Sequence, residues 1–397
     1  MGLCSSTPLR LVALLALCPA VATAQNFAPA VVRARGLGVP FEGAPGPLNA
    51  ITDVAGVEVG TSTLIRGEGA LKVGEGPVRT GVTVIFPRGA KNSDPVYAGW
   101  FSLNGNGEMT GTTWVEESGF LAGPVGITNT HSVGTVRDTF IAWGLKHDAM
   151  AQDWALPVVA ETYDGFLNDI NGFHVKPEDV ISALDSAKGG PVAEGNTGGG
   201  TGMICYGFKG GTGTASRVLP TDQGGYTVGV LVQCNCGRRP QLTIAGVPVG
   251  KEIPDAVPYA QAGGPEAPGS ETKGEVGSII IVVATDAPLL PHQLKRVARR
   301  ASLGLARTGS VSGNGSGDIF IAFSTANPHA DAEPGPNSVR TVSDERISPL
   351  FSATVEATEE AIVNAMVGAK TITGISGHTV VALPHDKLKQ VLKKYNR

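Results

Sequence analysis

Charged side chains are scarce in this chain of 397 residues. Lys, Arg, Asp and Glu make up 17% of it, whereas a typical soluble domain carries about 25%. The formal net charge is -4, which gives no basic patch. Because nucleic-acid binding depends on a dense positive surface, nucleic acid is not expected as a partner.

Recognisable metal-binding patterns are also missing. The seven histidines are scattered without a His-Glu-x-x-His motif, and no Cys-x-x-Cys pair occurs, so we expect no metal site. Three cysteines follow the N-terminal segment described below: Cys205, Cys234 and Cys236. An odd count means that at least one is unpaired or pairs between chains. Burial as small apolar side chains is the simplest role for them.

Long apolar runs are absent except near the N-terminus. One Arg precedes an apolar stretch over residues 11–16, and Ala22-Thr23-Ala24 forms a small-residue cleavage site. This pattern predicts a signal peptide over residues 1–24, removed before Gln25. The opening MGLCSS also fits a myristoylation pattern, but the apolar stretch behind it favours export. No other segment approaches the roughly 20 apolar residues of a membrane span. We therefore expect a soluble protein that is exported to the periplasm or secreted.

Glycine, in contrast, is abundant. The chain holds 55 glycines, about twice the usual share, and they lie between apolar segments, as is typical of tight turns and close backbone approaches. The segment GNTGGGTGM, residues 195–203, lacks the strand–loop–helix context and the Lys or acidic partner of a phosphate-binding loop. We interpret it as a backbone-lined site whose N–H groups approach a ligand.

Alternating strand and helix patterns dominate the second half of the chain. A strand over 279–284 precedes a helix capped by Asp286, with Pro288 in its first turn and Gly309 beyond its end. The other predicted elements are strands over 51–60, 80–89, 226–235, 318–326 and 379–384, helices over 132–147, 177–188 and 348–369, a short C-terminal helix, and an exposed loop over 238–277.

Ser278 lies where that exposed loop meets a buried strand. Gly277 ends the loop, and the unbroken apolar run over 279–283 follows directly. A serine nucleophile needs a base with a pKa near the working pH, yet there is no His nearby and no Gly-x-Ser-x-Gly elbow. Cleavage of the Gly277–Ser278 bond would supply one, since a free α-amine has a pKa of about 7.7–8.0. The alternative is that Ser278 is an ordinary loop residue at the start of a strand.

Several segments together resemble a family of self-processing N-terminal-serine aminopeptidases, the L-aminopeptidase/D-esterase and β-peptidyl aminopeptidase family. The segments that carry the resemblance are SLNGNGEMTGT, NTHSVGTVRD, VVAETYDGFLND, GNTGGGTGM, LVQCNCG, GSIIIVVATDAPLLPHQLKRVARRASLGLARTGS and SGNGSGDIFIAFST. The resemblance implies self-cleavage between Gly277 and Ser278 into an α chain, 25–277, and a β chain, 278–397, of one catalytic domain. It also implies an α/β (α+β) fold, a four-layer αββα sandwich layered like N-terminal nucleophile hydrolases.

The resemblance also implies a role for each of five residues. Ser278 is the expected nucleophile, Ser316 the residue that orients its proton, and Asp318 the acid that holds this network. The β-peptidyl members carry Glu at the place of Asp318, which is one methylene shorter. Without the resemblance, turn chemistry explains Ser316 and Asp318 equally well. Asn235 is the expected oxyanion donor, otherwise a turn residue, and Glu161 is expected to bind the substrate's ammonium group, otherwise a rim carboxylate.

The function that the resemblance implies is removal of one residue from the free N-terminus of short peptides, amides or esters through an acyl-enzyme, without a metal or organic cofactor. The expected partners are small peptides or aminoacyl amides, and other copies of the chain in a homo-oligomer of αβ units, often four. Export favours substrates that start with a β-amino acid, with L-α and D residues left open. The alternatives are an acyl transferase like ornithine acetyltransferase, which uses Thr inside cells, and an inactive exported binding protein.

Overall fold

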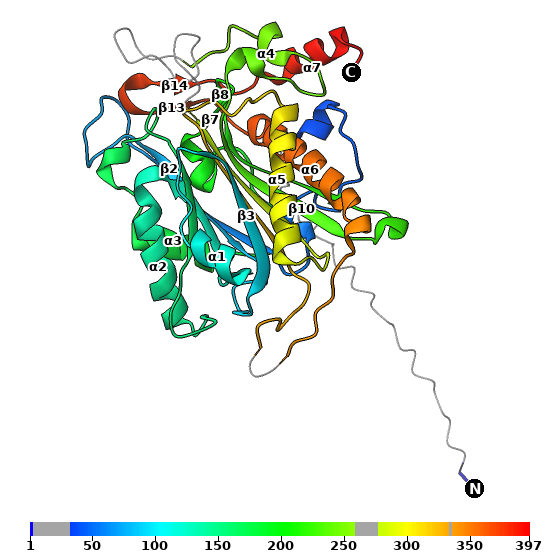
Figure 1. Ribbon diagram of the computed structural model, residues 1–397. Helices are drawn as coiled ribbons and strands as arrows, with labels where there is room; N and C mark the ends of the chain where they lie inside the picture. The colour runs from blue at the N-terminus through cyan, green and yellow to red at the C-terminus, as the bar shows by residue number, and fades with distance from the viewer. Residues whose placement is uncertain (3–31, 259–276, 333–335) are drawn as a thin grey trace. The chain divides into compact units, whose positions relative to one another are not determined.

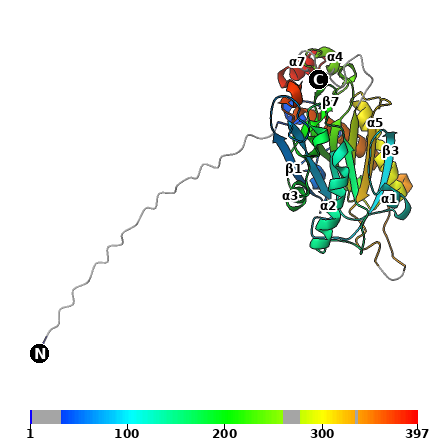
Figure 2. The ribbon, with the colours of Figure 1, turned by 90° about the vertical axis from the view of Figure 1, so that its left-hand side faces the viewer.

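Two β-sheets lie face to face at the centre of the structure, and helices cover the outer face of each sheet (Figure 1; turned view in Figure 2). The structure is a computed structural model that describes residues 1–2, 32–258, 277–332 and 336–397. The predicted signal peptide lies outside the described residues except for its first two, and so does the part of the predicted loop over 259–276. Residues 32–397 form one structural unit.

The smaller sheet has four strands and the larger sheet has six. In spatial order, the smaller sheet contains β1 (Glu58–Arg66), β2 (Val78–Phe86), β5 (Val125–Asn129) and β6 (Val158–Thr162). The larger contains β4 (Phe120–Leu121), β3 (Val96–Gly105), β12 (Gly317–Ser324), β11 (Ser278–Thr285), β10 (Thr227–Asn235) and β9 (Gly211–Val218). Among the strand pairs of the described residues, β5–β6 and β11–β12 are parallel and the others are antiparallel. Two small hairpins join β7 (Ile204–Cys205) to β8 (Phe208–Lys209) and β13 (Ile372–Thr373) to β14 (Thr379–Val380).

Helices complete four layers. The smaller sheet is covered by α2 (Val133–Lys146) and α3 (Pro177–Asp185), and the larger by α5 (Pro291–Arg307) and α6 (Ser348–Val367). The remaining helices are α1 (Thr112–Ser118), α4 (Val249–Glu252) and α7 (His385–Lys394). The expected αββα sandwich is therefore confirmed. Among the helices of the described residues, none is both long enough and apolar enough to cross a membrane.

Strand β11 explains why the sequence shows an unbroken apolar run behind Ser278. Side chains alternate between the two faces of a strand. Those of Ile279, Ile281 and Val283 belong to the core between the larger sheet and its helices. Those of Ile280 and Val282 belong to the core between the two sheets. Because both faces of β11 are covered, the strand requires apolar side chains at every position.

The predicted start of helix α5 is wrong. We expected Asp286 to cap this helix, but α5 begins at Pro291, and the Asp286 carboxylate instead accepts a hydrogen bond from the Thr227 backbone N–H at 2.8 Å. Thr227 begins the neighbouring strand β10, so the Asp286 side chain makes a tertiary hydrogen bond instead of capping the helix. Gly309 does lie just beyond the helix end, in the left-handed region with φ of 100°.

Two further predictions need correction. The predicted exposed loop is wrong over residues 239–253, because this segment includes a 3-10 turn and α4, and its side chains of Leu242, Val249 and Ile253 are buried. The predicted first strand is displaced: Ile51–Asp53 form a 3-10 turn, and β1 begins only at Glu58. In both segments the apolar pattern marks burial correctly but does not specify the local conformation.

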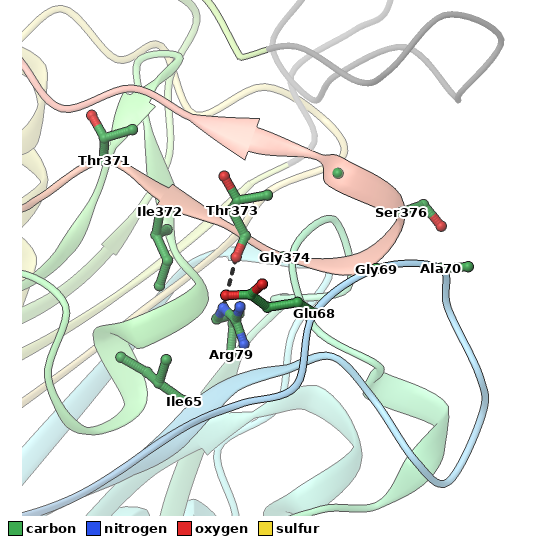
Figure 3. A pocket seen from close by; sticks show the side chains of 11 residues that line it. Ile65, Glu68, Gly69, Ala70, Arg79, Thr371, Ile372, Thr373, Gly374 and Ser376 are labelled. Atoms are coloured by element: carbon green, nitrogen blue, oxygen red, sulfur yellow. Dashed lines mark hydrogen bonds between the residues drawn. The ribbon is translucent and has the colours of Figure 1, made fainter.

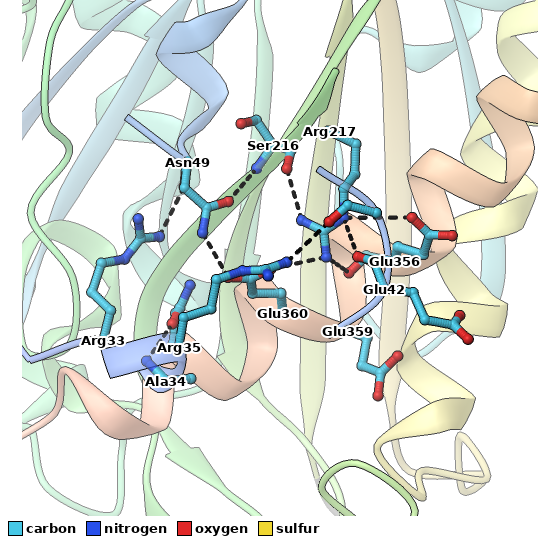
Figure 4. A network of polar contacts seen from close by, with 12 residues as sticks. Arg33, Ala34, Arg35, Glu42, Asn49, Ser216, Arg217, Glu356, Glu359 and Glu360 are labelled. Atoms are coloured by element: carbon cyan, nitrogen blue, oxygen red, sulfur yellow. Dashed lines mark hydrogen bonds and ion pairs between the residues drawn. The ribbon is translucent and has the colours of Figure 1, made fainter. Parts of the chain in front are cut away.

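A buried ionic network ties the segment before β1 to α6 and β9 (Figure 4). The Glu360 side chain on α6 is completely buried, and its carboxylate contacts Arg217 of β9 at 2.9 Å and Arg35 at 2.8 Å. The Asn49 amide donates to the same carboxylate at 2.6 Å. Since these contacts link residues on both sides of the Gly277–Ser278 bond, they would hold an α chain and a β chain together after cleavage.

Substitution of Glu360 by Gln should destabilise the fold strongly. Loss of the Glu360 charge leaves the buried Arg217 with only the longer contact of 3.5 Å to Glu356, and breaking a buried pair costs about 3–5 kcal/mol. We expect Glu360→Gln to lower the free energy of unfolding by about 3 kcal/mol, measured by urea denaturation in a Ser278→Ala background that keeps the chain continuous. Glu359→Gln, whose partner Arg307 is 42% exposed, should cost less than about 1 kcal/mol. Equal losses in both variants would contradict this account.

Candidate active site

Three strand ends meet around Ser278. Ser278 is the first residue of β11, and it is paired with Asn235, the last residue of β10, and with Gly317, the first residue of β12. The parallel β11 and β12 begin at the same edge of the sheet, and the antiparallel β10 ends there. The side chain of Ser278 belongs to the same face of β11 as Ile280, which faces the smaller sheet. Ser278 is only 5% exposed.

The backbone N–H of Gly317 lies beside the bond that the sequence predicts to be cut. This N–H is 3.2 Å from Ser278 Oγ and 3.1 Å from the carbonyl oxygen of Gly277. One donor is therefore within hydrogen-bonding distance of both the hydroxyl and the adjoining carbonyl. A donor so placed can stabilise negative charge that develops on the Gly277 oxygen.

Ser316 and Asp318 lie together, next to the start of β11. The Ser316 hydroxyl donates to Asp318 Oδ1 at 2.6 Å, and the Ile279 backbone N–H donates to the same oxygen at 3.2 Å. Both side chains are completely buried. The Asp318 carboxylate thus reaches Ser316 directly, although it is shorter than the Glu of the resembled family.

Two asparagines fix the glycine-rich turn that carries Ser316. The side-chain amide of Asn104 donates to the carbonyls of Ser312 and Gly313, each at 2.7 Å. The amide of Asn106 donates to the carbonyl of Gly315 at 2.9 Å. Asn104 lies in β3, which is paired with β12, and Asn106 directly follows β3. The turn is therefore anchored from the neighbouring strand as well as by its own hydrogen bond from the Ser316 N–H to the Gly313 carbonyl at 2.9 Å.

The side chain of Asn235 is held at both ends. Its Oδ1 accepts the Ile204 backbone N–H at 2.8 Å, and its Nδ2 donates to the carbonyl of Tyr163 at 3.1 Å. These partners assign the amide orientation. An amide nitrogen carries two hydrogens, so Nδ2 can donate to a second acceptor. Asn235 and Ser278 are paired across the two strands. An oxyanion that forms at Ser278 is therefore a candidate for the second acceptor of Nδ2.

Glu161 lies in β6 of the facing sheet, and it is 3% exposed rather than a rim carboxylate. Its carboxylate accepts hydrogen bonds from the Thr130 hydroxyl at 2.5 Å and the Glu108 backbone N–H at 3.1 Å. Burial raises the pKa of Glu161, and these hydrogen bonds partly oppose the rise.

Gly107 lies between the Glu161 carboxylate and the start of β12. A Cβ atom built on Gly107 would lie 3.2 Å from Glu161 Oε1 and 3.1 Å from Gly317 Cα. A side chain as small as a methyl group would therefore touch both. Glycine at this position allows the Glu161 carboxylate and the strand end that contains the Gly317 N–H to lie close to each other.

The glycine-rich segment does not present its N–H groups as we expected. Residues 198–202 form a buried 3-10 turn, in which Gly198 N–H donates to Thr63 Oγ1 at 2.8 Å and Gly199 N–H donates to Thr83 Oγ1 at 3.1 Å. The predicted ligand site is therefore wrong for these two groups. Their glycines serve close packing, since a Cβ on Gly199 would collide with the Gln233 side chain.

The three cysteines lie close together, and two of them flank Asn235 in the sequence. Cys205 and Cys234 form a disulfide, and Cys236 Sγ is buried 4.0 Å from Cys205 Sγ and 3.8 Å from Cys234 Sγ. Three sulfurs at this spacing could hold a metal ion, but metal ligation requires thiolates. With two sulfurs joined in a disulfide, the cluster does not offer three ligands.

A pocket of about 700 Å³ lies elsewhere, between the ends of β1 and β2 and the β13–β14 hairpin (Figure 3). Arg79 is part of its wall, and the guanidinium donates to the carbonyls of Thr373 at 2.7 Å and Gly67 at 3.0 Å. Ser278 does not line this pocket. Because Arg79 is used to join backbone segments, we do not assign the pocket to the chemistry at Ser278.

Several groups that shape the site have no distinguishing pattern in the sequence. Asn104, Asn106 and Thr130 lie in segments that carry the family resemblance, but nothing in their local pattern distinguishes them from turn residues. The backbone groups of Ile204 and Tyr163, which hold Asn235, leave no signal in the side-chain pattern. Only the folded register brings these groups to Ser278.

Comparison with known proteins gives consistent matches. The model of peptidase family S58 matches residues 49–380. Beta-peptidyl aminopeptidase BapA of Sphingosinicella microcystinivorans is 57% identical over 374 residues, covering 92% of this chain and 93% of the relative. The solved L-aminopeptidase D-Ala-esterase/amidase of Ochrobactrum anthropi, described as a variant of the Ntn hydrolase fold, matches with a TM-score of 0.83 and 50% identity, over 92% of this chain and 99% of that one. A Burkholderia sp. beta-aminopeptidase structure matches with a TM-score of 0.81 and 47% identity, over 91% and 99%.

Substitution of Gly317 by Ala should disrupt the site without removing any functional side chain. The added Cβ would collide with the backbone of Asn106 and Gly107, which displaces the N–H beside Ser278. We expect activity to fall at least about ten-fold, since small misplacements at a reacting centre can cost about 100-fold. Gly105→Ala is the matched control, because a Cβ there meets nothing within 4 Å. Activities should be compared at equal concentrations of folded protein, and an unchanged Gly317→Ala would contradict the geometry described.

Proposed function

We propose that this chain, which belongs to peptidase family S58, uses Ser278 as the nucleophile both of its own cleavage and of peptide hydrolysis. The chain is a serine aminopeptidase of the N-terminal nucleophile hydrolase type, and peptides are its substrates. The observation that carries the proposal is the position of the Gly317 N–H, within hydrogen-bonding distance of both Ser278 Oγ and the Gly277 carbonyl.

In the proposed self-cleavage, Ser278 Oγ attacks the carbonyl carbon of Gly277. The Gly317 N–H stabilises the negative charge on the carbonyl oxygen, and the Gly277–Ser278 amide becomes an ester as its C–N bond breaks. Water then hydrolyses the ester. The products are an α chain that ends in the Gly277 carboxylate and a β chain that begins with the Ser278 amine. If the signal peptide is also removed, these chains span 25–277 and 278–397.

In the proposed turnover, the new α-amine of Ser278 accepts the proton from its own hydroxyl. An α-amine suits this role because its pKa of about 7.7–8.0 lies near neutral pH. The hydroxyl oxygen attacks the substrate carbonyl, the leaving amine takes the proton, and water later hydrolyses the acyl-enzyme. The Ser316–Asp318 hydrogen bond orients the proton network.

Asn235 is the proposed oxyanion donor during turnover. Its Nδ2 has a fixed direction, because Ile204 and Tyr163 hold the amide, so little reorganisation is required when charge develops. Removal of a comparable donor lowers kcat about 10²–10³-fold. Asn235 thus acts only in the transition state, whereas Glu161 acts in substrate binding.

Glu161 is the proposed site for the free ammonium group of the substrate. A buried carboxylate favours a cationic partner over water, and only Gly107, which has no side chain, separates Glu161 from the Gly317 strand end. This arrangement requires an unblocked N-terminus and explains release of one residue at a time. The names of the relatives support a β-amino acid at that position, while the Ochrobactrum relative supports acceptance of L- and D-residues.

Export and assembly complete the proposal. The N-terminal pattern supports a periplasmic or secreted enzyme, and the family resemblance supports a homo-oligomer of αβ units, with four as the expected number. The relatives reported above are aminopeptidases, so they lend no support to an ornithine-acetyltransferase-like function or to an inactive binding protein.

Intact mass spectrometry tests the proposed cleavage. We expect the purified wild type to be two fragments, one of which begins at Ser278, and Ser278→Ala to remain one chain, because the variant lacks the attacking oxygen. Ser324→Ala is a matched control: it removes a buried hydroxyl at the far end of the paired strand β12 and should still yield two fragments. Wild type that remains one chain, or Ser278→Ala that is cleaved, would show the proposal to be wrong.

The pH dependence of KM tests the role of Glu161. Only the carboxylate binds an ammonium group, and burial raises the pKa of Glu161, so affinity is present near neutral pH and lost as pH falls through this raised pKa. As the pH is lowered, we expect the rise in KM to occur at a pH above the ordinary Glu pKa of about 4.3. Glu161→Gln should raise KM at least about ten-fold, as expected for the loss of one partner of a buried charge pair, and remove this titration.

Glu108→Gln provides the control for that pH profile. Glu108 is exposed, its backbone N–H still bonds to Glu161, and its own charge raises the pKa of Glu161. We therefore expect the same KM titration displaced to slightly lower pH. A titration that survives unchanged in Glu161→Gln would assign ammonium binding to another group.

A further inference from the structure

We propose that the Cys205–Cys234 disulfide is a positioning element for catalysis, which holds the Asn235 amide in line with Ser278. This inference rests on the proposed oxyanion role of Asn235. It follows from where the disulfide lies: Cys234 directly precedes Asn235, and Cys205 directly follows Ile204, whose N–H holds Asn235 Oδ1. The covalent bond thus joins the neighbours of the two residues that form this hydrogen bond.

Three consecutive residues of β7 and its turn are tied to three consecutive residues at the end of β10. Ile204 N–H donates to the Asn235 side chain at 2.8 Å, Cys205 is joined to Cys234, and Tyr206 N–H donates to the carbonyl of Cys236 at 2.7 Å. The disulfide is the central link of the three. It is also the only covalent one among them, and it sets the separation at which the two hydrogen bonds can form.

Strand β7 needs such a link because it does not belong to the larger sheet. It pairs only with β8, in a two-residue hairpin, so the ladder that fixes β10 against β11 does not fix β7. Close packing contributes as well, since a Cβ on Gly210 would collide with the Cys234 carbonyl. A displacement of β7 would move Ile204 away from Asn235 and allow the amide to rotate.

Rotation of that amide would affect the transition state in particular. An oxyanion donor acts when it lies about 2.7–3.1 Å from the position that the oxyanion occupies, and that charge does not exist in the bound substrate. Loss of alignment should therefore lower kcat and leave KM nearly unchanged. A disulfide that served folding alone would lower thermal stability without this selective effect on kcat.

The test compares a variant without the disulfide, Cys205→Ala/Cys234→Ala, with the matched control Cys236→Ala, which removes the third sulfur and keeps the disulfide. Rates are expressed per concentration of Ser278 N-termini, so that incomplete self-cleavage does not enter. We expect kcat to fall about ten-fold in the double variant with KM changed less than about two-fold, and the control to retain wild-type kcat.

A double-mutant cycle with Asn235→Ala separates this inference from the proposed function. Asn235→Ala should lower kcat about 10²–10³-fold, and removal of the disulfide in that background should cause no further fall, because the amide it positions is gone. Wild-type kcat in Asn235→Ala would overturn the oxyanion role itself. A normal fall in Asn235→Ala, combined with an equal disulfide effect in both backgrounds or with none, would overturn only the inference about the disulfide.

Reduction of already processed wild type keeps the test decisive if the double variant does not fold. Treatment with a phosphine, followed by alkylation under denaturing conditions and mass spectrometry, counts the thiols released from Cys205 and Cys234. Loss of kcat should follow the appearance of these two thiols, with about ten-fold loss at completion. Full kcat after both thiols have appeared would show that the disulfide does not position Asn235.

Discussion

The hydrogen-bonded register of β10, β11 and β12 is the constraint on which the rest of the site depends. It places Asn235, Ser278 and Gly317 side by side at one edge of the larger sheet. Burial on both faces of β11 prevents that register from slipping, because a shift by one residue would exchange the two sets of apolar side chains between different cores. The Ser278 hydroxyl is thus held at the start of a strand that is buried on both faces. A serine on a surface loop could change its position, whereas the strand register fixes the position of Ser278.

Much of the architecture follows from the sequence, and the reasons for the exceptions are physical. The run behind Ser278 predicts a doubly covered strand, and the helix over 348–369 is found as α6. Asp286 is not a helix cap, because the Thr227 N–H at the start of β10 takes its carboxylate. The roles expected of Ser278, Ser316 and Asp318 follow from the family resemblance. The structure joins Ser316 to Asp318 by a hydrogen bond, and Asp318 to the backbone N–H of Ile279, the residue after Ser278. Their supports come from segments far apart in the chain, as Asn104 and Ile204 do, so local pattern does not reveal them.

The scarcity of charge gives the few buried ionic groups distinct tasks. Glu360 joins the segment before β1 to α6 and β9 through Arg35 and Arg217, which is a structural role across the proposed cleavage point. Glu161 is buried and has hydrogen-bond donors around its carboxylate, which fits the proposed binding of a cationic ligand. Asp318 accepts from Ser316 and from the backbone of β11, which suits orientation of a proton. These three buried carboxylates differ in their partners, which fits the different roles proposed for them.

The central claim is that Ser278 Oγ, with its own amine as base, carries the acyl group during turnover. Covalent labelling with a serine-directed sulfonyl fluoride tests it most directly, with the modified residue located by tandem mass spectrometry of the fragment that begins at Ser278. The account predicts one label per fragment, on Ser278, and loss of activity in proportion to labelling. Activity retained after complete labelling of Ser278, or loss of activity with the label on another residue, would contradict it.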